Sequence, residues 1–205
     1  TKMMTALLVL ESGSDLNGSI TIPDSLTPEL QSIRANRGHT IGLQAGETVR
    51  RIDMLYAMLV PSANDAASVL ASDAAGGDLA AFASRMNSRA KALGCTNTHF
   101  TCPHGLYDGG SYATARDLAK IASACYQNST YMQIANTVRY ELPATNIHPA
   151  RTLTTTNWLL RTDGAYYRSY ARGMKTGFTT QAGRCFVTFA QQNGRAYGLV
   201  ILGSN

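Results

Sequence analysis

The first eleven residues are apolar on nearly every face of a helix. Met3, Met4 and the run at residues 7–10 point in different directions around the axis. A helix without a polar face is buried on all sides. The pattern therefore predicts a buried helix over residues 1–11, with Lys2 as the charged side chain near its start.

Turn residues divide the chain from residue 12 to residue 126 into a connecting region followed by helices. Residues 12–47 carry repeated turn signals and one short β-like piece at residues 19–22. Helices are expected over residues 48–60, 64–75, 79–93 and 114–126. Their expected caps and stops are Thr48, Pro61, Asn64 or Asp65, Gly94, and Thr114 in a capping box with Asp117.

Patterns typical of strands begin after Tyr166. Strands are expected over residues 171–178, 184–191 and 195–202, and Asn193-Gly194 is a strong hairpin signal between the last two. Helices followed by an antiparallel meander indicate a mixed α/β (α+β) domain. We expect a single domain over residues 1–205, with a helical part to about residue 165 and strands from about residue 166.

Composition narrows the function classes. The apolar share of 44% is ordinary, and the charged share of 15% argues against disorder and against a highly charged nucleic-acid binder. The net charge of +5 is spread along the chain. Such a surplus is typical of a solvated surface, and it would also suit a cell wall or a carboxylate-bearing substrate. No run of 18 apolar residues exists that could span a membrane.

The four cysteines fit no common zinc pattern. Cys95 and Cys102 could form a disulfide in an oxidising compartment, or both could be buried free thiols. The sequence leaves both alternatives open.

Three short motifs carry residues that could act together in acyl transfer. Thr1-Lys2 begins the buried helix, Ser62-Ala63-Asn64 links two helices, and Lys175-Thr176-Gly177 ends a strand. Each motif is weak evidence when it is taken alone. Serine acyl-transfer enzymes need S-x-x-K, S-x-N and K-T-G together, because a serine hydroxyl is a poor nucleophile until a base takes its proton.

Lys2 is the candidate general base. Taken alone, a lysine at a helix end more often extends its ammonium group into solvent. A lysine in an all-apolar helix is poorly solvated, however, which disfavours the charged form and lowers its pKa. A second ammonium group nearby, on Lys175, would act in the same direction.

The serine that belongs to Lys2 in an S-x-x-K motif should stand two residues before Thr1, outside residues 1–205. The chain itself contains one complete S-x-x-K, Ser88-Arg89-Ala90-Lys91. The apolar stripe of its helix consists of Leu79, Phe82, Ala83, Met86, Ala90 and Leu93. At about 100° per residue Ser88 falls opposite that stripe and Lys91 well off it. We expect both to face water, where a lysine keeps its proton.

The ordered motifs T-K-M-M, P-S-A-N-D-A-A, C-P-H-G-L and G-M-K-T-G-F-T-T-Q-A-G resemble those of the D-alanyl-D-alanine carboxypeptidases among the low-molecular-mass penicillin-binding proteins. The resemblance runs along essentially the whole chain. It implies the penicillin-binding protein/β-lactamase-like transpeptidase fold, in which a helical subdomain packs against an antiparallel sheet. That family has two more strands before the S-x-x-K helix and a helix after the last strand, so we expect flanking segments on both sides. The family often has Asn where Cys102 stands.

The resemblance also implies roles for matched residues. The catalytic set would be Lys2, Ser62, Asn64 and Lys175, and the substrate-binding set Thr176, Gly177, Phe178 and Thr179. The serine before Thr1 would attack the D-Ala-D-Ala carbonyl, and Lys2 would take its proton. The backbone N–H of Phe178 would contribute to the oxyanion hole. His104 and Asp117 are expected to be structural, one packing a loop and the other capping a helix.

The implied substrate is a peptidoglycan stem peptide ending in D-Ala-D-Ala, and β-lactam antibiotics would acylate the same serine. No metal, no cofactor and no nucleic acid is expected. The implied location is outside the cytoplasm of a bacterium, in the cell envelope or secreted, with any membrane association through flanking segments.

Two alternatives to the carboxypeptidase remain open. A class A-like β-lactamase shares the three motifs but needs a glutamate that activates water for deacylation. Its E-x-x-L-N signature is not found between Ser62 and Lys175, and the nearest stretch, residues 141–146, has its Asn one place late. The other alternative is a non-catalytic module that binds peptidoglycan peptides or β-lactams. Residues 1–205 alone, without the serine, are expected to bind but not to turn over.

Overall fold

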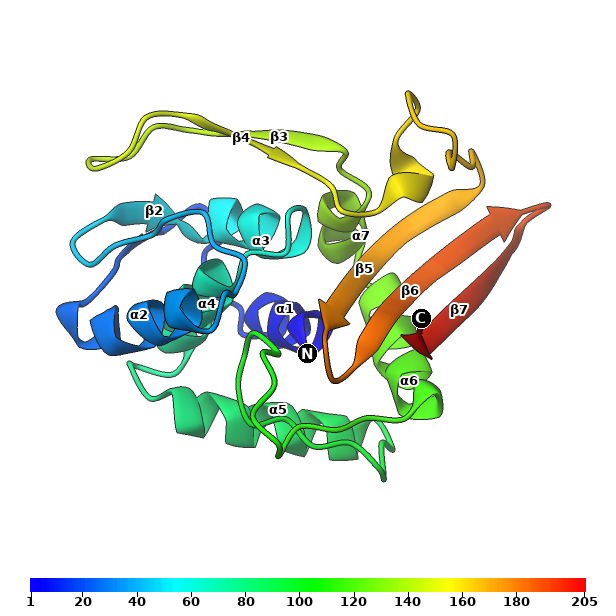
Figure 1. Cartoon of the computed structure of the whole chain (residues 1–205), viewed down its shortest axis with the longest axis horizontal. Coiled ribbons are helices and arrows are strands. Elements are labelled where there is room, and N and C mark those ends of the chain that lie inside the picture. Colours follow the sequence, from blue (N-terminus) through cyan, green and yellow to red (C-terminus); the bar gives the residue numbers. More distant parts are fainter.

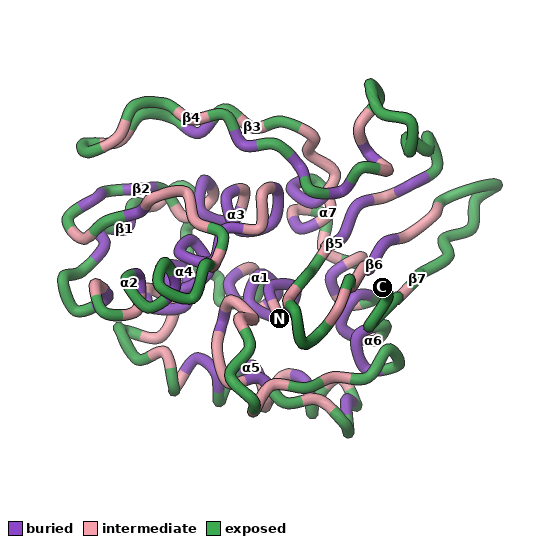
Figure 2. The backbone as a smooth tube through the Cα atoms, viewed as in Figure 1, coloured by how far each residue is buried: buried purple, intermediate pink, exposed green.

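The computed structural model describes residues 1–205 as helices gathered around one central helix, with a three-stranded sheet along one side (Figure 1). The central helix, α1 (Lys2–Glu11), contacts five other helices and the first strand of that sheet. The other helices are α2 (Thr27–Ala35), α3 (Arg51–Leu59), α4 (Asn64–Ala74), α5 (Leu79–Ala92), α6 (Ala115–Tyr126) and α7 (Ser129–Ala135), with short 3-10 turns η1 (Asp24–Leu26) and η2 (Trp158–Leu160). α1 is buried along most of its length, as its apolar pattern predicts (Figure 2).

The sheet is an antiparallel meander in the order β5-β6-β7. Its strands are β5 (Ala171–Thr179), β6 (Gly183–Gln192) and β7 (Arg195–Ser204), which confirms the three expected strands. Asn193 and Gly194 have φ of 51° and 73°, and positive φ at both central residues is the mark of a type I′ hairpin turn. α7 packs against β5 and α6 against β7, so these two helices join the sheet to the helical part.

The chain before residue 166 holds more structure than its pattern indicates. The sequence did not predict the helices α2 and α7. It also did not predict the antiparallel hairpin of β3 (Arg139–Leu142) and β4 (Arg151–Thr154). The prediction that Thr48 caps a helix is wrong, because Thr48 lies in β2 (Thr48–Arg50) and α3 begins at Arg51. β2 pairs with β1 (Ser19–Thr21), and this pairing places Ile20 opposite Val49 with both side chains buried. Burial of this distant pair outweighs the local cap signal.

The expected cap of α4 is also wrong in detail. The residue at the N-cap is Ala63, and no side chain caps the helix. The carboxylate of Asp65 instead accepts hydrogen bonds from three successive backbone N–H groups, those of Ile41 (3.0 Å), Gly42 (3.1 Å) and Leu43 (3.1 Å). Asp65 therefore fixes the loop at residues 41–43 beside the first turn of α4.

The expected cap by Thr114 and the expected stop at Gly94 are confirmed. The hydroxyl of Thr114 accepts from the backbone N–H of Asp117 at 3.1 Å and caps α6. Gly94, at φ 76°, follows the end of α5. All four cysteines are free thiols, so Cys95 and Cys102 are not bridged. No helix combines the length and the apolar character that crossing a membrane would require.

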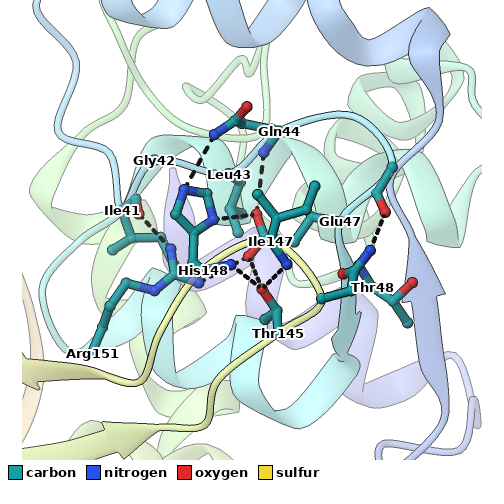
Figure 3. Close-up of polar contacts among 12 residues, drawn as sticks. Ile41, Gly42, Leu43, Gln44, Glu47, Thr48, Thr145, Ile147, His148 and Arg151 are labelled. Atoms are coloured by element: carbon teal, nitrogen blue, oxygen red, sulfur yellow. Dashed lines mark hydrogen bonds and ion pairs between the residues drawn. The ribbon is translucent and has the colours of Figure 1, made fainter.

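Glu47 is a fully buried carboxylate that fastens the β3–β4 hairpin to the loop before β2 (Figure 3). Its partners are Arg151 (3.0 Å), Thr145 (2.8 Å), His148 (3.2 Å) and the backbone N–H of Gln44 (3.3 Å). Arg151 donates a further hydrogen bond to the carbonyl of Ile41 at 2.6 Å. A buried charge is tolerated when it is paired and hydrogen-bonded. Residues 41–44 are thus held both by this network, at Ile41 and Gln44, and by the carboxylate of Asp65.

Gly173 lies where β5 passes the end of α7. A Cβ atom on Gly173 would lie 2.1 Å from the carbonyl oxygen of Ala135. Since that oxygen belongs to the backbone, it cannot rotate away, and we expect Gly173→Ala to lower the free energy of unfolding by about 2–3 kcal/mol. Urea unfolding measures the change. Gly177→Ala on the same strand is the matched control, because its Cβ would meet only the Cβ of Cys185, at 3.6 Å. Equal losses in the two variants would contradict this packing.

Candidate active site

A cleft of about 680 Å³ opens between the start of α1, the turn before α4 and the end of β5. All eight residues that the resemblance assigned line it: Lys2, Ser62, Asn64, Lys175, Thr176, Gly177, Phe178 and Thr179. Figure 1 shows the same convergence, with the N-terminus of α1 next to the lower end of β5. The fold thus brings together three motifs that lie far apart in the sequence.

Lys2 is buried at the base of this cleft, with 8% of its surface exposed. Its ammonium group donates hydrogen bonds to the side-chain oxygen of Asn64 and, at 2.7 Å, to the backbone carbonyl of His104. Burial lowers the pKa of Lys2 to about 8, although the negative charges of Cys102 and Asp65 oppose the shift. The alternative that Lys2 extends its ammonium group into solvent is therefore wrong. A lysine with this pKa is partly neutral near neutral pH, and a neutral lysine can accept a proton.

Ser62 and Asn64 stand in the tight turn between α3 and α4. Ser62 has φ 73°, a left-handed conformation that residues with a Cβ rarely adopt. Such strain persists only where the surroundings enforce it, and it is concentrated at functional sites. The backbone N–H of Asn64 donates to the carbonyl of His39 at 2.7 Å, and Asn64 is 5% exposed. The turn thereby points the amide side chain of Asn64 toward Lys2.

Lys175 lies on β5, buried with 9% exposure, and faces the same cleft. Its ammonium group donates to the carbonyl of Thr176 at 2.9 Å and meets no carboxylate. Burial, and then repulsion from the charge of Lys2, lowers the pKa of Lys175 well below its ordinary value. The sequence indicated that Lys175 would lower the pKa of Lys2, whereas the effect resolved in the structure is that of Lys2 on Lys175.

The end of β5 forms the opposite wall. The hydroxyl of Thr176 lies 2.5 Å from the hydroxyl of Thr156, a residue that no sequence motif indicated. Phe178 is 67% exposed, and the guanidinium of Arg184 lies 5.5 Å from the centre of its ring. Gly177 and Thr179 complete this wall.

The segment at residues 102–106 contributes more than loop packing. The carbonyl of His104 accepts from Lys2, and the hydroxyl of Thr5 donates to the carbonyl of Pro103 at 2.6 Å, so the segment is bound to α1. Gly105, at φ 82°, passes so close to Thr1 that an added Cβ would lie 2.7 Å from the threonine hydroxyl. Sequence reasoning missed this role, because a backbone carbonyl has no residue signature.

The ring of His104 is held in one orientation. Its Nδ1 accepts from the backbone N–H of Leu106 at 3.0 Å, and its Nε2 lies 3.1 Å from the carboxylate of Glu29. Glu29 also accepts from the hydroxyl of Ser68 at 2.8 Å. An Nδ1 that accepts leaves the hydrogen on Nε2, directed at Glu29. Asp117 also serves structure, but its side chain does not complete the expected capping box of α6. Its carboxylate accepts instead from the backbone N–H of Asn97 at 2.8 Å and from the hydroxyl of Thr98 at 3.0 Å.

Ser88 and Lys91, the complete S-x-x-K inside the chain, lie on the outer face of α5. Both side chains are exposed, as expected, and neither lines the cleft. The motif is therefore a surface coincidence.

The cleft has basic side chains in its lining and no acidic ones. Its lining includes the basic residues Lys2, Lys175 and Arg37, and it includes no aspartate and no glutamate. A concave site with one sign of charge attracts ligands of the opposite sign. A basic lining without acidic groups favours an anionic ligand.

Comparisons with known proteins agree with this geometry. A family model described as D-alanyl-D-alanine carboxypeptidase (peptidase S11) matches residues 1–205. A D-alanyl-D-alanine carboxypeptidase of Streptomyces sp. strain K15 is 35% identical, over 100% of this chain and 71% of the relative. A D-alanyl-D-alanine endopeptidase of Escherichia coli K12 is 34% identical, over 98% of this chain and 61% of the relative. The chain thus spans between three fifths and three quarters of these two relatives.

Solved structures show the same fold. The crystal structure of the Streptomyces K15 DD-transpeptidase superposes with a TM-score of 0.87 at 33% identity, covering 99% of this chain and 78% of that one. A D-alanyl-D-alanine carboxypeptidase of Mycobacterium tuberculosis H37Rv gives 0.80 at 28% identity, covering 100% and 73%. The expected α+β transpeptidase fold is confirmed. With its three motifs gathered in one cleft, this chain belongs to the D-alanyl-D-alanine carboxypeptidase family of serine peptidases.

Proposed function

We propose that the protein is a serine-type D-Ala-D-Ala carboxypeptidase that removes the terminal D-alanine of peptidoglycan stem peptides and is acylated by β-lactams. One observation carries the proposal: a buried lysine of lowered pKa, held by Asn64, shares a cleft with Lys175. A lysine can act as the general base for a serine only in its neutral form, which a lowered pKa makes accessible. Because the family consists of cell-wall enzymes, we place the protein outside the cytoplasm of a bacterium, with any membrane association through flanking segments.

In the proposed mechanism the nucleophile is a serine two residues before Thr1. Its hydroxyl oxygen attacks the carbonyl carbon of the penultimate D-alanine while Lys2 takes the proton. The bond to the terminal D-alanine then breaks, and the proton passes through Ser62 and Lys175 to the departing amine. Water hydrolyses the resulting ester and frees the serine.

The remaining residues bind the substrate. Asn64 would hold the substrate's peptide amide as well as Lys2. Thr176, with Lys175, would face the terminal carboxylate, and Gly177 and Thr179 would border the bound peptide along β5. The backbone N–H of Phe178 would donate to the developing oxyanion, and such donors are worth several kcal/mol in the transition state.

The cleft lining counts against a class A-like β-lactamase. That chemistry needs a glutamate beside the acyl group, and no acidic residue lines the cleft. Glu141, in the stretch nearest to the lactamase signature, lies on β3 and pairs with Arg139 at 2.7 Å. An acyl-enzyme formed from penicillin should therefore persist.

The activity is tested on the full-length protein with a peptide ending in D-Ala-D-Ala. We expect release of one equivalent of D-alanine per peptide and slow hydrolysis of benzylpenicillin. Rapid turnover of penicillin would favour the β-lactamase. Absence of both D-alanine release and a covalent adduct would leave the non-catalytic binding module.

The pH dependence follows from the pKa of Lys2. The base must be neutral, so with a pKa of about 8 the acylation rate should rise with pH and level off above that value. Below it, each pH unit should lower the rate about tenfold. Stopped-flow acylation by a chromogenic β-lactam between pH 6 and pH 10 measures the profile. A flat profile across this range would contradict Lys2 as the base.

A further inference from the structure

Arg37 occupies a backbone position that favours glycine. It follows the end of α2, and its backbone N–H donates to the carbonyl of Arg34 at 3.0 Å. The next N–H, of Gly38, donates to the carbonyl of Ile33 at 2.8 Å. This pair of hydrogen bonds is the Schellman motif, in which the residue at the position of Arg37 adopts the left-handed conformation and is usually glycine. Arg37 has φ 55°.

Three residues other than glycine have positive φ in this chain: Arg37, Ser62 and Asn193. Asn193 lies in a hairpin turn, where asparagine is tolerated. Ser62 and Arg37 both line the cleft. A local rule broken without structural gain marks a site where function retains the residue. The side chain of Arg37 is therefore the feature to explain.

The guanidinium of Arg37 is exposed at the rim of the cleft and pairs with no carboxylate of the chain. Its neighbour Gly38 lies against the turn that carries Ser62 and Asn64. A Cβ added to Gly38 would lie 2.6 Å from Nδ2 of Asn64. Arg37 thus stands on the Asn64 side of the cleft. The K-T-G residues, proposed to face the terminal carboxylate, form the opposite wall.

We propose that Arg37 is a specificity residue that binds a second carboxylate of the substrate, on the side chain of the residue preceding D-Ala-D-Ala. This inference rests on the proposed function. A stem peptide held by its amide at Asn64 extends past Asn64 toward Gly38 and Arg37. Because no acid lines the cleft, a carboxylate there meets the guanidinium without competition. Arginine is suited to such a bidentate contact.

The test compares two pairs of peptides. The first pair is acetyl-Glu-D-Ala-D-Ala and acetyl-Gln-D-Ala-D-Ala. The second pair has 2-aminopimelate, or its side-chain amide, in place of Glu and Gln. The full-length wild-type protein should prefer the acid in at least one pair. In Arg37→Gln, which keeps the backbone strain and loses the charge, the ratio of kcat/KM for acid to amide should fall about three- to tenfold. Arg37→Lys, which keeps the charge but not the bidentate geometry, should give a ratio between those of the wild type and Arg37→Gln.

Arg37→Gly separates charge from strain. It should lower the same ratio and, by relieving the left-handed strain, raise Tm by about 2–4 °C. Asn193→Gly, outside the cleft, should leave the ratio as in the wild type. If Arg37→Gln releases D-alanine with an unaltered ratio of kcat/KM for acid to amide, the inference about Arg37 is overturned and the proposed function stands. A wild-type protein that neither releases D-alanine nor forms a penicillin adduct would overturn the proposed function and this inference with it.

Discussion

Lys2→Ala is expected to lower the rate of acylation by benzylpenicillin by about 10³-fold or more, the size of a lost general base. The buried ammonium group is the polar partner of Asn64 in the cleft and carries a lowered pKa. Alanine cannot take the proton of a serine, and it leaves the amide of Asn64 without its donor. Single-turnover kinetics of adduct formation measure the loss.

Lys91→Ala is the matched control for this loss. Lys91 belongs to the S-x-x-K on the outer face of α5, and its side chain is exposed. We expect the wild-type acylation rate in this variant. A rate in Lys2→Ala within tenfold of the wild type would remove Lys2 from the mechanism.

Lys175→Ala is expected to lower acylation by about 10²–10³-fold with little loss of stability. Its amino group lines the cleft where the substrate's carboxylate is proposed to bind, and loss of one such hydrogen-bond donor has an effect of this size. The lysine hydrogen-bonds only to the carbonyl of Thr176, so few contacts of the core depend on it.

Two measurements on Lys175→Ala separate function from fold. Urea unfolding should give a midpoint close to that of the wild type, since burial and the charge of Lys2 already disfavour the ammonium group. Acylation kinetics should show the loss. Unchanged acylation would exclude Lys175 from the mechanism, and a large drop in the unfolding midpoint would make its role structural.

The sequence predicts those parts of the fold that local patterns control. α1 follows from an apolar run, and the turn between β6 and β7 follows from the positive φ that Asn193 and Gly194 tolerate. The cap at Thr114 is equally local. The placement of Lys2, Ser62 and Lys175 in one cleft followed from the resemblance, since nothing local brings such distant residues together.

Other parts depend on contacts between distant segments. β2 replaces the expected helix start at Thr48 because Val49 finds a buried partner in Ile20. The β3–β4 hairpin is held by the buried carboxylate of Glu47, whose partners come from separate loops. The carbonyl of His104 was missed because every residue has a carbonyl. Arg37 was missed because its left-handed backbone appears only in the structure.

We propose that Lys2 is the general base for a serine that stands two residues before Thr1, in a cleft that it shares with Ser62, Asn64 and Lys175. Peptide mapping by mass spectrometry of the full-length protein after benzylpenicillin treatment tests it most directly. We predict one penicilloyl adduct, on the serine two residues before Thr1, with Ser88 unmodified. An adduct on Ser88, or none at all, would contradict the account.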